Sequence, residues 1–84
     1  MKNIKEIIEI AKKAKAKRII EMNKYIEEKI EPIILQRAEK GGDNASIESK
    51  PLEAELIEHI IKTYTEAGYS VNQDYKYIII RWEN

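Results

Sequence analysis

The sequence predicts a single α+β domain in which a long N-terminal helix precedes a β-α-β-β body with a three-stranded sheet of order 1-3-2. Apolar residues recur at helical spacing in the first forty residues, at Ile4, Ile7, Ile8, Ala11, Met22, Ile26, Ile30 and Ile33. The closing segment, residues 73–82, reads QDYKYIIIRW and carries apolar side chains at consecutive positions. Because successive side chains of a strand point to opposite faces, this pattern is typical of a central strand covered on both sides.

The predicted first helix has a clear start, an interruption and an end. Asn3 followed by Glu6 has the form of a capping box, in which each side chain accepts a hydrogen bond from a free backbone amide. Pro32 removes a helical hydrogen bond and clashes with the carbonyl four residues back, so a kink or short break is expected near Glu31. Gly41-Gly42 then ends the helix.

Residues 1–40 therefore form a helical arm, and residues 41–84 form a body too small to cover it. A helix of about 25 residues at the start of the arm would be about 40 Å long. This length predicts a homo-oligomer formed through the N-terminal helix. Lys15 and Arg18 fall inside the apolar stripe, near the expected helix–helix contact, where they could neutralise a small anionic ligand such as a nucleotide.

The body contains three predicted strands and one helix. Residues 45–49 form a short strand, Pro51 opens a helix over residues 51–67, and residues 69–71 precede a turn at 72–74 and the final strand. A final strand between the other two is antiparallel to both. The second helix can cover only one sheet face, so the N-terminal helix, from the same chain or a partner, is expected on the other.

The final strand offers candidate binding residues. Its alternation places two sets of side chains on opposite faces: Ile78, Ile80 and Trp82 on one, and Tyr75, Tyr77 and Ile79 on the other. Amphipathic aromatic residues anchor protein interfaces and line ligand pockets. The second set is therefore either the other half of the core or a patch that meets a partner or ligand.

No motif indicates catalysis. His59 is the only histidine and is predicted to lie on a solvated side of its helix, whereas a zinc site needs three or four ligands. The glutamates fall on polar helix faces, and there is neither a nucleophile elbow nor a phosphate-binding loop. We expect no enzyme activity, no metal and no cofactor. No apolar run approaches the about 18 residues of a membrane-spanning helix, so a cytoplasmic protein is expected.

The charges are distributed unevenly, although the net charge is zero. Residues 1–40 carry eleven Lys/Arg against seven Asp/Glu, and residues 41–84 carry four against eight. A basic cluster comprises Lys12, Lys13, Lys15, Lys17 and Arg18. Such a cluster could bind the phosphates of a nucleic acid. Its charges spread around the helix, however, which favours a solvated or inter-subunit role.

The segment from Ala38 to Trp82 resembles a class of small proteins encoded by phages and prophages of Gram-positive bacteria. The resemblance is carried by A-x-x-G at Ala38 to Gly41, a short strand with Ile47, an apolar helix, AGYSV, and the closing YIIIRW. It implies a viral protein of the host cytoplasm that binds a host or defence component stoichiometrically. A virion or assembly subunit, and a nucleic-acid-binding regulator using residues 12–18, are the alternatives.

Overall fold

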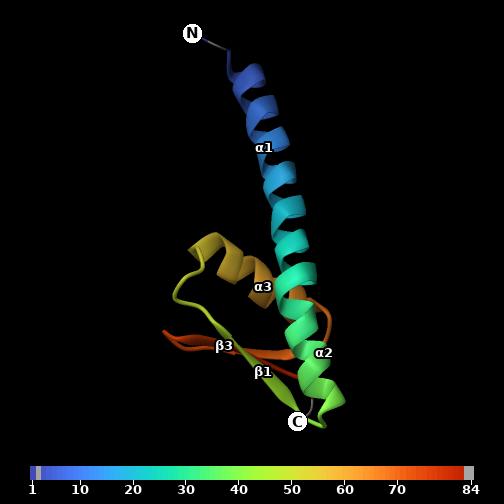
Figure 1. The fold of residues 1–84 in the computed structure, drawn as a ribbon. Coiled ribbons are helices and arrows are strands. Elements are labelled where there is room, and N and C mark those ends of the chain that lie inside the picture. The colour runs from blue at the N-terminus through green and yellow to red at the C-terminus, as the bar shows by residue number, and fades with distance from the viewer. Residues whose placement is uncertain (2, 83–84) are drawn as a thin grey trace.

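The structure, a computed structural model, describes residue 1 and residues 3–82 and consists of a long helical rod that rises from a small body (Figure 1). The rod comprises α1 (Ile4–Tyr25), the π-helical segment η1 (Ile26–Ile30) and α2 (Glu31–Glu39). The body comprises β1 (Asn44–Glu48), α3 (Ala54–Glu66), β2 (Ser70–Gln73) and β3 (Tyr77–Arg81). The principal extents are 57 × 23 × 21 Å, because the N-terminal half of α1 projects beyond the body.

The rod begins where the sequence predicts. Asn3 is the N-cap of α1, and its Oδ1 accepts a hydrogen bond from the Glu6 backbone amide at 3.0 Å. The cap satisfies one of the amides that a helix start leaves without a partner. At the other end, Gly41 adopts a φ of +82°, a conformation that glycine reaches without steric strain.

The irregularity expected near Glu31 is a π-helical turn rather than a break. The segment η1 directly precedes Pro32 in the chain, and the Glu31 amide bonds to the Ile26 carbonyl, five residues back. The wider turn makes room for the proline ring and tolerates the absence of a backbone N–H at Pro32, so the helix continues on both sides. The rod is thus one helix from Ile4 to Glu39 with a single local insertion.

The sheet has the predicted order, β1-β3-β2, with β3 antiparallel to both neighbours. Ala45 and Ile47 of β1 lie opposite Ile80 and Ile78, respectively. On the other side, Val71 of β2 lies opposite Ile80. The α+β class and the central position of the last strand are therefore confirmed.

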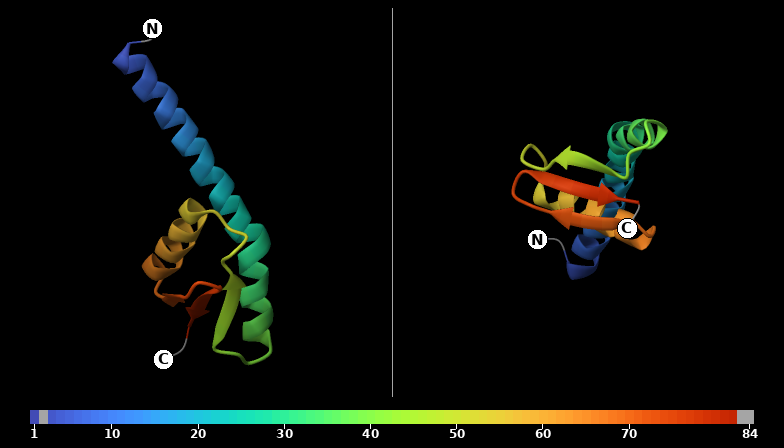
Figure 2. Two further views of the ribbon diagram at one scale, coloured as in Figure 1. Left: turned by 90° about the vertical axis from the view of Figure 1, so that its left-hand side faces the viewer. Right: turned by 90° about the horizontal axis from the view of Figure 1, so that it is seen from below.

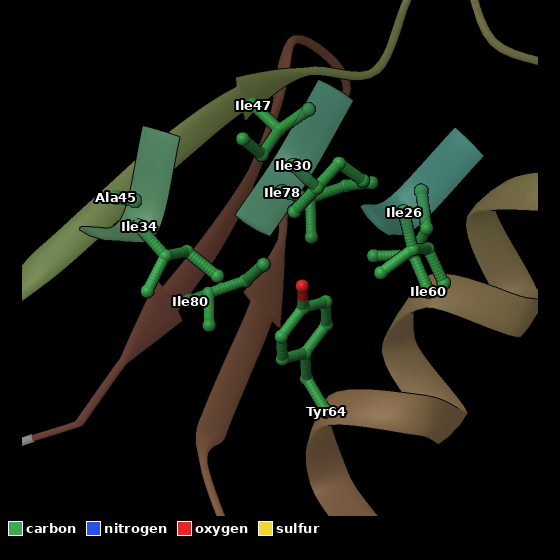
Figure 3. Packing of buried hydrophobic residues seen from close by; sticks show 9 residues of the cluster. All are labelled: Ile26, Ile30, Ile34, Ala45, Ile47, Ile60, Tyr64, Ile78 and Ile80. Atoms are coloured by element: carbon green, nitrogen blue, oxygen red, sulfur yellow. The ribbon is translucent and has the colours of Figure 1, made fainter. Parts of the chain in front are cut away.

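The core lies on one face of this sheet only. Figure 3 shows rod side chains and α3 side chains converging on the same face of β1 and β3. The buried apolar residues are Ile26, Ile30, Ile34, Ala45, Ile47, Ile60, Tyr64, Ile78 and Ile80. The expectation that the chain's own N-terminal helix covers the second face is wrong, since the rod and α3 share the first face. Among the described residues no helix lies over the second face, as the right-hand view in Figure 2 shows.

Two element boundaries in the body differ from those predicted. Pro51 lies in a turn closed by the Leu52 amide on the Ser49 carbonyl, at 3.0 Å, and α3 begins three residues later, with Glu53 as its N-cap. The β2–β3 turn falls at Tyr75 and Lys76 rather than at residues 72–74. Asp74 explains this position, because its Oδ1 accepts hydrogen bonds from two backbone amides of the turn, at 2.7 Å each.

Candidate functional site

The first exposed surface is an isoleucine tip, formed by Ile4, Ile7, Ile8 and Ile10. Within Ile4–Tyr25 no residue is buried. Ile4 is 74% exposed and Ile7 is 51% exposed, on the part of α1 that stands clear of the body in Figure 1. Contiguous exposed apolar side chains of this kind are typical of interaction surfaces.

Lys15 and Arg18, the polar intrusions in the apolar stripe, lie where α1 passes α3. Arg18 Nη1 is 3.0 Å from Glu55 Oε2, in the first turn of α3. Lys15 borders a shallow groove together with Ile19 of α1 and Glu58 of α3. The stripe is interrupted because α3 presents carboxylates at this level. The Arg18 charge is compensated within its own chain, and both partners are exposed, so the pair contributes little to stability.

A second groove, which we call the α1–α3 groove, lies between α1 and the start of α3. Its volume is about 200 Å³, and it is open on one side. Met22 and Tyr25 of α1 and Leu56 of α3 supply apolar walls, and Glu21 and Glu53 supply acidic edges. Among the described residues, Glu21 and Glu53 form no ion pair. The α1–α3 groove thus combines apolar walls with two unpaired carboxylates, and the Arg18–Glu55 ion pair lies at its edge.

Polar contacts also join the rod to α3. His59 is half-buried and its Nε2 lies 2.7 Å from Asn23 Oδ1, so this side of α3, expected to be solvated, is partly covered by α1 at His59. The Tyr64 hydroxyl donates to Glu31 Oε1 at 2.6 Å. Burial and, to a lesser extent, this hydrogen bond raise the pKa of the Tyr64 hydroxyl above its ordinary value. These contacts fix the rod on α3 and so shape the α1–α3 groove.

The open face of the sheet is the third surface. Tyr77 is 39% exposed and Ile79, between Ser46 and Asn72 of the neighbouring strands, is half-buried. Arg81 falls on the same face by strand alternation. Sequence reasoning missed Arg81, although its spacing of two from Ile79 places it there. The open face therefore carries an aromatic, an aliphatic and a cationic side chain in one row.

Tyr75 does not join this row. It lies in the β2–β3 turn, is 83% exposed, and has the Lys76 ammonium 5.5 Å from its ring centroid. Its predicted place on the strand beside Tyr77 and Ile79 is wrong, because the turn forms two residues later than expected. The structure thus brings Tyr77 and Ile79 together, and places Lys15 and Arg18 on the rod, away from the open face.

The basic cluster runs from the projecting part of α1 to the level where α1 passes α3. All five of its side chains are solvated, and the aromatic residues of the chain begin only at Tyr25. Within residues 1 and 3–82, no three His, Cys, Asp or Glu side chains are close enough to hold a metal ion. No helix in this part of the chain combines the length and the hydropathy needed to cross a membrane.

Comparisons with protein-family models, with curated proteins and with solved structures found no match for this chain.

Proposed function

We propose that this chain is a non-enzymatic binding protein that associates with a second copy through α1 and binds a protein partner on the open face of its sheet. The observation that carries the proposal is the isoleucine tip, an apolar surface that its own chain leaves uncovered. A chain of 84 residues with a thin core has a strong reason to cover such a surface by self-association.

The energetics of the tip support association. Complete burial of an isoleucine side chain contributes about 1.5–3 kcal/mol, and the four isoleucines of the tip are 45–74% exposed. In a two-fold dimer each of these side chains occurs twice in the interface, once from each copy. This burial is the favourable contribution that would offset the free-energy cost of bringing two chains together.

The open face has the composition of a protein-binding surface. Tyrosine and arginine are enriched among the residues that dominate binding energies, and Tyr77 and Arg81 flank Ile79 on β3. The surrounding residues of the face, including Ser46 and Asn72, are small or polar. A flat row of this kind suits the surface of a folded protein. One copy of the chain would bind one copy of that partner.

The resemblance to small phage proteins supports the same function, with a host or defence component as the partner and the host cytoplasm as the compartment. A small anionic ligand is less favoured, because Arg18 already pairs with Glu55. A nucleic-acid-binding role predicts retention of the chain on a DNA or RNA column that weakens steeply with salt. Retention of this kind, lost on reversing the charges of the basic cluster, would displace the proposal.

Light scattering tests the self-association. We expect the wild-type chain to have twice the mass of one chain, and Ile7→Gln to shift it toward the single-chain mass at the same concentration. Ile20→Gln is the matched control. Ile20 is 67% exposed but lies about 140° around α1 from Ile7, so its replacement should leave the mass unchanged. A wild-type chain that stays single at high concentration contradicts the proposal.

A further inference from the structure

The isoleucine tip and the α1–α3 groove lie on one side of the same helix. Ile4, Ile7, Ala11, Ala14 and Arg18 follow one another at spacings of three and four residues, which keeps them along one side of α1. The groove begins at Arg18 and continues past Met22 to Tyr25. The isoleucine tip and the α1–α3 groove thus form one continuous surface along α1. Within a single chain the tip cannot reach the groove, because both lie on the same helix.

The geometry points to an antiparallel two-fold dimer in which the isoleucine tip of each copy occupies the α1–α3 groove of the other. This inference rests on the proposed self-association and specifies its partner and its site. When the two α1 helices run in opposite directions, Ile4 of one copy lies within one residue of the level of Met22 of the other. Ile7 then lies level with Arg18, and Ala11 with Ala14.

The basic cluster favours the antiparallel over the parallel arrangement. Parallel, in-register helices would set all five cations of residues 12–18 beside the same five of the second copy. Like charges at an interface are repulsive and exclude such pairings. In the antiparallel register, residues 12–18 of one copy lie level with residues 7–13 of the other, so only residues 12 and 13 coincide.

In the middle of the proposed contact, small side chains allow the two α1 helices to approach closely. Ala11 and Ala14 are the smallest side chains on this side of α1, and they meet at the two-fold axis. On either side of them, Ile7 rests against the methylene stem of Arg18, whose guanidinium remains on Glu55. The polar intrusion in the stripe is therefore compatible with an apolar contact.

The ends of the contact are complementary in shape and charge. Ile4 enters between Met22 and Leu56, the apolar walls of the α1–α3 groove. Lys5, next to it, approaches the acidic edges at Glu21 and Glu53, which form no ion pair among the described residues. The two bodies do not meet, because each stands about 27 Å of helix away from the tip of its own α1 and so lies at the opposite end of the contact from the other body.

Cysteine cross-linking tests the arrangement, since the natural chain contains no cysteine. One chain carries Ile4→Cys and a second chain carries Met22→Cys, and the two are mixed under mild oxidation. We expect a mixed disulfide to form at least about tenfold faster than that between Ile4→Cys and Lys24→Cys. Lys24 is exposed and lies close to Met22 along the helix, but on the opposite side of α1.

The outcomes separate this inference from the proposed function. A dimeric wild-type chain with a rapid mixed disulfide at Ile4 and Met22 supports both. A dimeric chain in which Ile4→Cys cross-links to itself instead overturns the antiparallel register and leaves the self-association standing. Equal rates for the Met22 and Lys24 pairs also overturn the inference. A wild-type chain of single mass overturns both.

Discussion

The Tyr64 hydroxyl of α3 and the Glu31 carboxylate of the rod are joined by a hydrogen bond of 2.6 Å at the point where η1 gives way to α2. Tyr64 is 2% exposed, so its ring belongs to the core while its hydroxyl reaches the surface of the rod. Glu31 is also the residue before Pro32. The irregular part of the rod is thus the part that is tied most closely to α3.

Removing the Tyr64 hydroxyl should weaken this attachment. Tyr64→Phe keeps the ring in the core and leaves the partly solvated Glu31 without its donor, which costs about 1–2 kcal/mol of the free energy of unfolding. Urea denaturation measures the change. Tyr75→Phe is the control, because Tyr75 lies exposed in the β2–β3 turn, and it should have no effect. Equal stabilities for Tyr64→Phe and wild type would show that the hydrogen bond contributes nothing.

The same group makes stability depend on alkaline pH. Burial raises the pKa of Tyr64 in the folded chain above the ordinary value of 10.0. The folded state therefore holds this proton where the unfolded state has released it, and stability falls as the pH rises past about 10. This contribution is complete below that pH. The stability difference between wild type and Tyr64→Phe, measured by urea denaturation at pH 8 to 11, should shrink or change sign above pH 10. A constant difference contradicts the assignment.

The residues of β3 show what the sequence could predict about the sheet and what it could not. The prediction that β3 is the central strand of the sheet was correct. It rested on Ile78, Ile79 and Ile80, because a strand with apolar side chains on both faces is rarely at a sheet edge. The pattern could not show what lies over each face. Ile79 is half-buried between its strand neighbours, and no helix of the described residues lies over that face of the sheet (Figure 2). Strand alternation assigns side chains to a face, but only tertiary packing decides which elements cover that face.

The rod shows a similar division between local and tertiary information. The Asn3 cap and the disturbance near Pro32 depend on neighbouring residues, and both were predictable. The pairing of Arg18 with Glu55 was not, since it depends on where α3 crosses the rod. The position of the β2–β3 turn depended on the side chain of Asp74, which accepts two backbone amides. An aspartate at this position is a turn signal that the sequence itself contains.

Alanine substitutions on the two faces of β3 should differ widely. Ile78 is fully buried in the core, so Ile78→Ala should lower the free energy of unfolding by about 2–5 kcal/mol. Ile79→Ala removes the same atoms from the open face and should cost less than about 1.5 kcal/mol. Thermal or urea unfolding at low concentration measures both. Equal losses would mean that the second face is also buried, which contradicts one-sided coverage of the sheet.

Deleting one residue from the projecting part of α1 tests whether association depends on the orientation of the isoleucine tip or only on its composition. Removal of Lys13 keeps every isoleucine but turns the tip by about 100° relative to the α1–α3 groove. The two-fold contact then loses its alignment, and light scattering should report an association at least about tenfold weaker. At concentrations where both chains are single, the body should unfold at the same urea concentration as in wild type, because Lys13 is exposed and far from the core.

The charge change in this deletion works against the expected result, which makes the test stringent. Loss of Lys13 removes one cation from the basic cluster, and this alone should favour association of the two copies. Lys13→Ala is the matched control, since it removes the same charge without turning the tip. It should associate as well as wild type or better. If the deletion and Lys13→Ala associate equally, the orientation of the isoleucine tip is irrelevant, and the contact between copies does not depend on one face of α1.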